Sequence, residues 1–393
     1  MTRHLVASLV VRLASVLALW LGSPIVSAAQ GTGPLSSITD GQSAHDGETQ
    51  SGRTSSDAPV GEYPSLHLSG FGNVDFAAQN KSEGSRGFAE GQFILHLASA
   101  LSPRVNFFGE LSLTPRADAG TGSPVASGYN AEVERVIIRF DQSDHLKVSF
   151  GKFHTPVNWW NTAFHHGAWL QTTISRPEMT QFGGSFIPVH FVGALVEGSF
   201  PAAGWNINYQ GGIGNGRGNV ISRAGDAGDN NARPAYVFNL FTKPDRAFGL
   251  QVGGSLYLDR VSVTGRPEFA ERIVAAHAIW QREDPEVIAE IADVRHDQVG
   301  GGLTSSSLAY YIQLAYRLPT FGRVWKPYFR FEHIDIDPTD QVFAAVPVLD
   351  GSTLGVRYDI STYAAIKSEV RLRRRLSGQP STNGWFLQVC FTF

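Results

Sequence analysis

Apolar and polar side chains alternate with a period of two over most of this chain. In one of the clearest segments, 246–260, Leu250 and Val252 alternate with Gln251 and Ser255. A period of two places every second side chain on the same face of a β-strand. The pattern therefore predicts an all-β fold in which each strand has one apolar face and one polar face.

Sixteen segments are predicted to be strands on this basis. They are 65–78, 88–101, 104–115, 129–141, 145–154, 187–200, 204–214, 234–243, 246–260, 271–282, 286–296, 305–317, 323–336, 352–360, 362–375 and 384–393. An even count is typical of the barrels that bacterial outer membranes contain. In lipid such a barrel must close, because only closure pairs every backbone N–H and C=O of a β protein.

The connections between these segments are expected to alternate strictly between long and short. Short connections include 142–144 and 201–203, whereas 155–186 and 215–233 are long. Outer-membrane barrels have this asymmetry because their periplasmic turns are short and their outer loops are long. A soluble β-sandwich, the alternative all-β fold, has no reason for it. The sequence therefore favours a transmembrane up-and-down antiparallel β-barrel of about sixteen strands.

The N-terminal region has the pattern of an exported protein. Arg3 precedes an apolar stretch at 13–26, and the small residues at 27–29 follow it. This order is typical of a secretory signal peptide. The next stretch is rich in Gly, Ser, Thr, Asp and Pro and has few aliphatic residues to bury, which indicates a disordered linker. We expect a signal peptide at 1–28, a disordered linker at 29–62 and an outer-membrane β-barrel at 63–393.

The last strand offers a second indication of the outer membrane. Trp385, Leu387, Val389, Phe391 and Phe393 alternate on one face, and Phe393 is the final residue of the sequence. This ending resembles the C-terminal signal of outer-membrane proteins, and the resemblance implies that the barrel-assembly machinery is a partner. The alternative is a last core strand that happens to end in Phe.

Composition excludes some classes of partner and cofactor. The formal net charge of -3 provides no basic field that would attract nucleic acid. With one cysteine, the chain has no Cys-x-x-Cys-His motif for haem attachment. No cofactor is expected.

Three short segments resemble the phosphate-selective porin type of Gram-negative bacteria. They are Val-Ser-Phe-Gly-Lys-Phe-His-Thr-Pro at 148–156, Pro-Val-His-Phe-Val-Gly at 188–193 and Pro-Tyr-Phe-Arg-Phe-Glu at 327–332. The resemblance implies a channel of sixteen strands, located in the outer membrane and assembled as a homotrimer. It also implies that the third outer loop folds into the pore.

The connection at 155–186 is that third long loop, and its composition is unusual. A loop of this length is more often functional than accidental, and folding into the lumen would bury its aromatic side chains. The candidate constriction residues are Trp159, Trp160, His165, His166, Trp169, Arg176 and Glu178. No metal is expected at the two histidines, because adjacent side chains point in different directions and no Cys or carboxylate lies beside them at ligand spacing.

Basic side chains modestly outnumber acidic ones on the faces expected to line the lumen. The candidate pore-lining residues are Arg135, Arg139, Lys147, Arg317, Lys326, Arg330, Arg357, Lys367, Arg371 and Arg373. Fixed cations in a confined pore attract anions, so a weak anion preference is one hypothesis. Mutual neutralisation by cross-strand ion pairs is the alternative. Arg374 and Arg375 are instead expected at the outer rim, where they would bridge lipopolysaccharide phosphates.

These features together predict a porin that allows passive diffusion of small hydrophilic solutes or anions and that contacts outer-membrane lipid and lipopolysaccharide. The function needs no catalytic residues, so the chain is not expected to be an enzyme. One alternative is a plugged barrel that serves as a scaffold or sleeve for a partner protein. Another is an outer-membrane hydrolase, although no Gly-x-Ser-x-Gly motif supports it.

Overall fold

A computed structural model of the chain describes residues 63–80, 86–116, 128–165, 167–182, 186–219, 221, 225–231, 233–262, 264–375 and 382–393. All of them belong to one compact unit, Gln42–Phe393. The predicted signal peptide at 1–28 and the linker at 29–62 lie outside the described residues.

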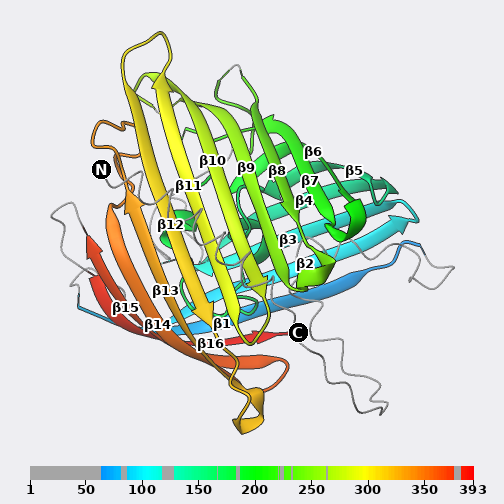
Figure 1. The fold of residues 1–393 in the computed structure, drawn as a ribbon, viewed down its shortest axis with the longest axis vertical. Helices are drawn as coiled ribbons and strands as arrows, with labels where there is room; N and C mark the ends of the chain where they lie inside the picture. The colour runs from blue at the N-terminus through cyan, green and yellow to red at the C-terminus, as the bar shows by residue number, and fades with distance from the viewer. Residues whose placement is uncertain are drawn as a thin grey trace. The chain divides into compact units, whose positions relative to one another are not determined.

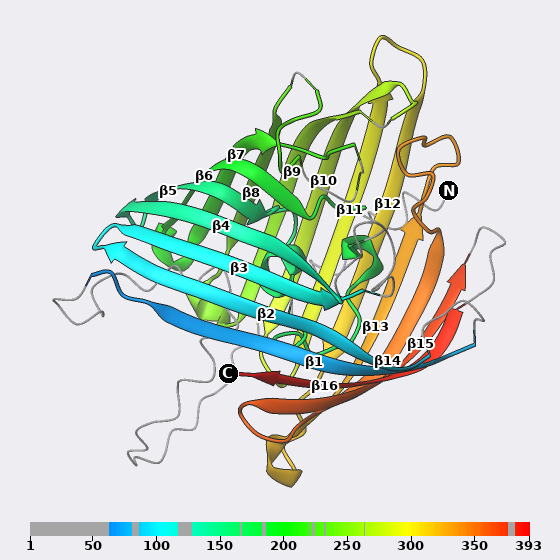
Figure 2. The same cartoon turned by 180° about the vertical axis from the view of Figure 1, so that it is seen from behind.

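Sixteen strands form, each close to its predicted position. They are β1 (His67–Gln79), β2 (Gly87–Ser102), β3 (Val105–Pro115), β4 (Tyr129–Ser143), β5 (Leu146–His154), β6 (His190–Phe200), β7 (Ile207–Asn215), β8 (Ala235–Thr242), β9 (Leu250–Ser262), β10 (Glu268–Gln281), β11 (Glu286–Gln298), β12 (Thr304–Ala315), β13 (Trp325–Asp335), β14 (Leu349–Asp359), β15 (Ala364–Arg375) and β16 (Thr382–Thr392). Each strand pairs antiparallel with its neighbours in sequence, and β1 pairs with β16 to close the barrel. Figures 1 and 2 show this continuous wall from its two sides.

The first and last strands meet closely at the closure. Gly70 donates its N–H to the Phe393 carbonyl at 3.1 Å, and Phe393 donates back to Gly70 at 3.0 Å. A Cβ on Gly70 would lie 2.5 Å from Cζ of the Phe393 ring and 2.6 Å from the Ile94 carbonyl oxygen. Only glycine therefore leaves room for the terminal aromatic ring over this strand.

The alternation seen in the sequence separates the two faces of the barrel wall. On β12, Leu314 is 44% exposed, whereas its neighbour Gln313 is fully buried and Tyr311 is 2% exposed. The apolar residues Val252 on β9 and Leu354 on β14 are exposed in the same way. The exposed apolar face suits contact with lipid, while the buried face carries most of the polar and charged side chains.

The helical elements are short. They are α2 (Trp160–Phe164) and the 3-10 turns η3 (Glu178–Thr180), η4 (Ala202–Gly204), η5 (Asp245–Ala247) and η6 (Phe321–Arg323). Within the described residues, no helix has the length and apolarity needed to span a membrane.

The expected strict alternation of long and short connections is wrong between β9 and β13. The connections at 263–267 and 299–303 belong to the long series but have only five residues each, whereas 316–324 in the short series has nine. The two short connections result from strand pairing that extends further than expected, since Ser262 pairs with Glu268 across one and Asp297 pairs with Thr304 across the other. Residues expected in loops are used there to extend the hairpin.

Candidate functional site

The longest connection joins β5 to β6 and spans 155–189. It contains α2 and η3, and many of its side chains are buried, among them Trp160 at 0%, Phe164 at 2% and Trp159 at 7% exposure. They belong to a hydrophobic cluster that also includes inner-face residues of β9 to β13, such as Tyr257 and Tyr311. Trp169 is partly buried, and His166 lies outside the described residues.

The first part of this connection is held by β9 and β11. The backbone N–H groups of Trp159 and Trp160 both donate to Glu290 Oε1, each at 2.7 Å. The N–H of Asn158 donates to Ser255 Oγ at 3.0 Å. Charge-assisted bonds to a buried carboxylate are among the stronger hydrogen bonds in proteins, so they fix the start of α2 against these strands.

The second part of the connection is held by acidic side chains of β11, β13 and β15. Glu369 Oε2 accepts the backbone N–H groups of residues 174 and 175 at 2.9 and 3.2 Å. Glu332 Oε2 accepts the N–H of Glu178 at 2.6 Å, and Glu286 Oε1 accepts the Thr172 hydroxyl at 3.0 Å. The segment therefore contacts strands far from β5 and β6 in the strand order.

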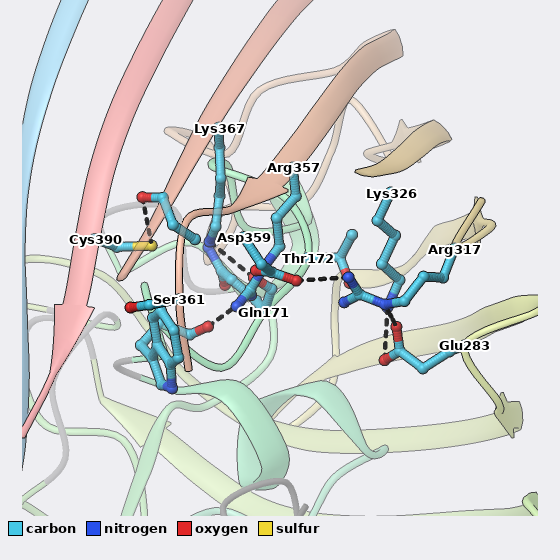
Figure 3. Close-up of polar contacts among 12 residues, drawn as sticks. Gln171, Thr172, Glu283, Arg317, Lys326, Arg357, Asp359, Ser361, Lys367 and Cys390 are labelled. Carbon is cyan, nitrogen blue, oxygen red and sulfur yellow. Dashed lines mark hydrogen bonds and ion pairs between the residues drawn. The ribbon is translucent and has the colours of Figure 1, made fainter. Parts of the chain in front are cut away.

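Three predicted pore-lining cations donate to carbonyl oxygens of the same segment. Arg330 Nη1 bonds the Ser175 carbonyl at 2.9 Å, and its Nη2 bonds the Arg176 carbonyl at 3.0 Å. Arg357 Nη1 bonds the Trp169 carbonyl at 2.8 Å. Lys367 Nζ bonds three carbonyls, those of residues 168, 171 and 173. Figure 3 shows Arg357 and Lys367 converging on Gln171.

Arg317 and Lys326 form an ion-pair network beside this group. Lys326 Nζ lies 3.1 Å from Glu283 Oε1 and 2.7 Å from Glu286 Oε2. Arg317 bonds Glu283 and also lies 2.5 Å from Asp359 (Figure 3). Burial raises the pKa of Glu283, but the attraction of Lys326 and the hydrogen bond from Arg317 outweigh it and lower that pKa to about 2.

The remaining cations of β15 are paired with carboxylates. Arg371 Nε lies 2.5 Å from Glu369 Oε1, and Arg373 Nη1 lies 2.5 Å from Glu178 Oε2. Glu178 thus joins the connection to β15 through its side chain as well as to β13 through its backbone. The side chains of Arg374 and Arg375, expected at the rim, lie outside the described part of the chain.

The basic residues of β4 and β5 contact carboxylates of the neighbouring wall. Arg135 Nε lies 2.5 Å from Glu110 Oε2, and Arg139 Nε lies 2.6 Å from Asp141 Oδ1. Lys147 lies across from Asp141 on one side and Glu197 on the other. Arg135 and Arg139 are thus in ion pairs, which agrees at these two positions with the alternative of mutual neutralisation.

His165 meets two histidines that the sequence analysis did not select. His154 ends β5 and His190 begins β6, and these two residues are cross-strand partners. His165 follows α2, and its ring centroid lies 3.8 Å from that of His154 and 4.7 Å from that of His190. A usable signal was present in the sequence, because His154 and His190 flank the long connection at its two ends.

Arg176 is buried near the same histidines. Its Nη1 donates to the His165 carbonyl at 2.9 Å, and its guanidinium stacks on the Phe182 ring at 3.7 Å. Burial lowers the pKa of Arg176 to about 9, although the Glu134 carboxylate counteracts this. The guanidinium therefore remains charged at neutral pH.

The barrel resembles several solved outer-membrane proteins, although their sequences are distant. The loop L8 deletion mutant of OmpT from Vibrio cholerae has a TM-score of 0.55 at 12% identity, and the match covers 84% of this chain and 100% of that one. The channel DcaP of Acinetobacter baumannii gives 0.56 at 11% identity, covering 84% and 97%. Salmonella typhi OmpF in complex with daunomycin gives 0.55 at 10% identity, also covering 84% and 97%.

No family model matches the sequence, and no curated protein matches it either. The phosphate-selective family suggested by the three short segments is accordingly not identified by these comparisons. The closed sixteen-strand barrel, its exposed apolar face and its structural neighbours agree on a coarser description. The chain has the porin-like β-barrel fold of Gram-negative outer-membrane proteins.

Proposed function

We propose that the protein is a passive diffusion channel of the outer membrane, in which the connection at 155–189 crosses and narrows the lumen. The observation that carries the proposal is the set of bonds from this connection to β9, β11, β13, β14 and β15. In a closed order of sixteen strands, β13 lies opposite β5 and β6, where the connection is rooted. Bonds to both sides support a path of the connection between them, and sixteen strands normally leave an aqueous interior.

A weak anion preference is the second part of the proposal. Some cations belong to residues 168–178 or bond them, and others bond the carboxylates that hold this segment. Together they are Arg176, Arg317, Lys326, Arg330, Arg357, Lys367, Arg371 and Arg373. The carboxylates bonded to them or to the segment are Glu178, Glu283, Glu286, Glu332, Asp359 and Glu369. The cations outnumber the carboxylates, and an excess of fixed positive charge in a narrow zone favours anions.

The remaining features of the proposal rest on the fold and on the sequence. We propose outer-membrane lipid and lipopolysaccharide as contacts of the apolar wall, and the barrel-assembly machinery as the partner that reads the end at Phe393. A homotrimer is proposed because one structural neighbour is described as the trimer form of Vibrio cholerae OmpT, at 10% identity and a TM-score of 0.55. Phosphate selectivity is not part of the proposal, because no family model matches the chain.

A plugged barrel is the second candidate, and one observation favours it. The connection at 155–189 is buried and extensively bonded, so it also suits a permanent plug in a scaffold or sleeve.

The proposed channel is not an enzyme. Ser307, His296 and Asp340 do meet, but Ser307 Oγ donates to Asp340 at 3.4 Å, whereas a hydrolase requires the hydroxyl to bond the histidine.

Single-channel conductance in planar bilayers separates the two candidates. The purified protein is expected to give steady ohmic steps, and under a salt gradient the sign of the reversal potential should indicate a modest preference for anions. A correctly folded barrel that gives no steps would overturn the channel and favour the plug. Steps with a cation-selective reversal potential would retain the channel and reject the anion preference.

A further inference from the structure

Three histidines and one glutamate come together where the long connection leaves and re-enters the barrel wall. Ligand atoms of His154, His165 and His190 all lie within 4.8 Å of one another. The fourth residue is Glu134 on β4, whose Oε2 lies 3.0 Å from His190 Nε2 and 3.9 Å from His165 Nε2. Strands β4, β5 and β6 and the end of α2 each contribute one of these side chains.

The separations suit one shared ion. In tetrahedral coordination, two ligands that are each about 2.0–2.2 Å from Zn²⁺ lie roughly 3.3–3.6 Å apart. The two distances from Glu134 Oε2, 3.0 and 3.9 Å, lie on either side of this range. The histidine ligand atoms are no more than 4.8 Å from one another, so shifts of roughly 1 Å, which side-chain rotation supplies, bring them to it.

Hydrogen bonds from outside the cluster orient two of its members. Asn161 donates its amide hydrogens to the carbonyls of Thr155 and Val189 at 3.0 and 2.9 Å, which leaves Oδ1 to face His165 Nδ1 at 3.2 Å. The hydrogen of His165 is thereby assigned to Nδ1, which leaves the lone pair on Nε2, the nitrogen 3.9 Å from Glu134 Oε2.

The carboxylate is oriented in the same way. Ser112 Oγ donates to Glu134 Oε1 at 2.7 Å, so Oε2 is the oxygen that faces the histidines. Such outer hydrogen bonds are the usual means by which metal ligands are held in place.

His190 provides an independent indication. Its side chain is 10% exposed, and its Nε2 is buried without a hydrogen bond although Glu134 Oε2 lies 3.0 Å away. A nitrogen and a carboxylate oxygen this close, but not aligned for a hydrogen bond, have the relation of two ligands to a common cation. Without such a cation, a buried polar nitrogen that makes no hydrogen bond destabilises the folded protein.

We propose that His154, His165, His190 and Glu134 bind one divalent transition-metal ion of the Zn²⁺ class. Three imidazoles and a carboxylate form a donor set that suits Zn²⁺ and its neighbours, whereas Mg²⁺ and Ca²⁺ prefer oxygen ligands. The bound ion would fasten the end of α2 to β4, β5 and β6, so it would fix the connection at its root. The nearby Arg176 guanidinium opposes a cation, and the Glu134 carboxylate offsets it.

The first test is metal binding by the folded protein without a polyhistidine tag, in detergent. We expect one Zn²⁺ per chain in competition with a chromogenic chelator. Bound Co²⁺ should show the visible bands of a site with nitrogen ligands rather than those of the aqueous ion. Binding of no Zn²⁺, or a Co²⁺ spectrum identical to that of the free ion, would overturn the proposal without any substitution.

The second test assigns the ligands. His165→Ala and His190→Ala should each weaken Zn²⁺ binding by about 100-fold or more, since losing an outer partner alone costs 10–100-fold. His277→Ala is the matched control, because His277 is a buried strand histidine that contacts Gln251 rather than this cluster. Unchanged affinity in both ligand variants would contradict the site. Both tests measure metal binding rather than conductance. Failure of the metal site can therefore be distinguished from failure of the proposed channel.

Discussion

Two groups of basic residues face different partners on the two sides of the barrel. On β13 to β15, Arg330, Arg357 and Lys367 donate to backbone carbonyls of the long connection, although Arg357 also bonds Asp359 and Arg330 lies 3.7 Å from Glu332. On β4, Arg135 and Arg139 lie against the carboxylates of Glu110 and Asp141. Both groups are well buried, so exposure does not distinguish them.

The difference lies in what happens to the charge. A carboxylate satisfies the hydrogen bonds of a cation and also cancels its charge, whereas a carbonyl dipole satisfies the hydrogen bonds only. Lys367 is the clearest case, because it bonds three carbonyls and forms no ion pair within the described part of the chain. We therefore expect the β13–β15 group to hold the connection and to supply the positive field, and the β4 group to stabilise the wall.

The largest effect is expected from Arg330→Met. The arginine is fully buried and bonds Ser175, Arg176 and Thr173, so its loss leaves the carbonyls of Ser175 and Arg176 without this donor and removes a cation 3.7 Å from Glu332. Unfolding free energy should fall by about 3–5 kcal/mol, and conductance should rise as the connection is released. Chemical denaturation and planar-bilayer recordings measure the two effects.

Arg135→Met is the matched control for Arg330→Met. It removes another buried arginine, which is paired with Glu110 on the neighbouring strand. Stability should fall while conductance stays near that of the wild type. Equal increases of conductance in both variants would erase the distinction between the two groups.

Acid should destabilise the β13–β15 side through Glu283. The folded pKa of about 2 lies below the ordinary value of 4.5 for a glutamate, so the carboxylate contributes stability above pH 4.5, and this contribution is lost as the pH falls towards 2. The contribution is about 2–3 kcal/mol. Thermal unfolding followed from pH 6 to pH 2 should show this loss, and Glu283→Gln should lack it. If the stability of Glu283→Gln falls with pH as steeply as that of the wild type, the loss does not come from Glu283.

Selectivity should respond to Lys367→Gln more than to Arg139→Gln. The charge of Lys367 is not cancelled by a carboxylate within the described part of the chain, whereas Arg139 is bonded to both carboxylate oxygens of Asp141. Removing one uncancelled charge near the narrow zone should lower the anion-to-cation permeability ratio by roughly two- to fivefold. Reversal potentials under a salt gradient give the ratio. A larger shift in Arg139→Gln would reverse the roles of the two groups.

The smallest effect is expected from Arg295→Gln. Arg295 pairs with Asp297 on β11, but the two side chains are 43% and 45% exposed. Water and salt screen such a pair, so neither stability nor conductance should change measurably. A clear loss of stability would mean that exposed pairs matter in this barrel, and the interpretation of both buried groups would need revision.

The strand pattern was predictable because it depends on local periodicity. All sixteen strands were placed within a few residues of their observed bounds, since a lipid-facing strand must repeat its apolar residues every second position. Strict alternation of connection lengths was not predictable, because pairing of β9 with β10 and of β11 with β12 decides where those hairpins end. The connection at 155–189 was identified by its length and its aromatic residues, but its partners were not.

The sequence by itself determined the all-β class, the number of strands and the position of the longest connection, because these follow from the order of neighbouring residues along the chain. Only the tertiary structure decided which cations meet carbonyls and which meet carboxylates. It also brought His154 and His190 to His165 and Glu134. Those contacts join residues that are far apart in the sequence, and the strand register and the path of the long connection, which no local pattern encodes, set their distances.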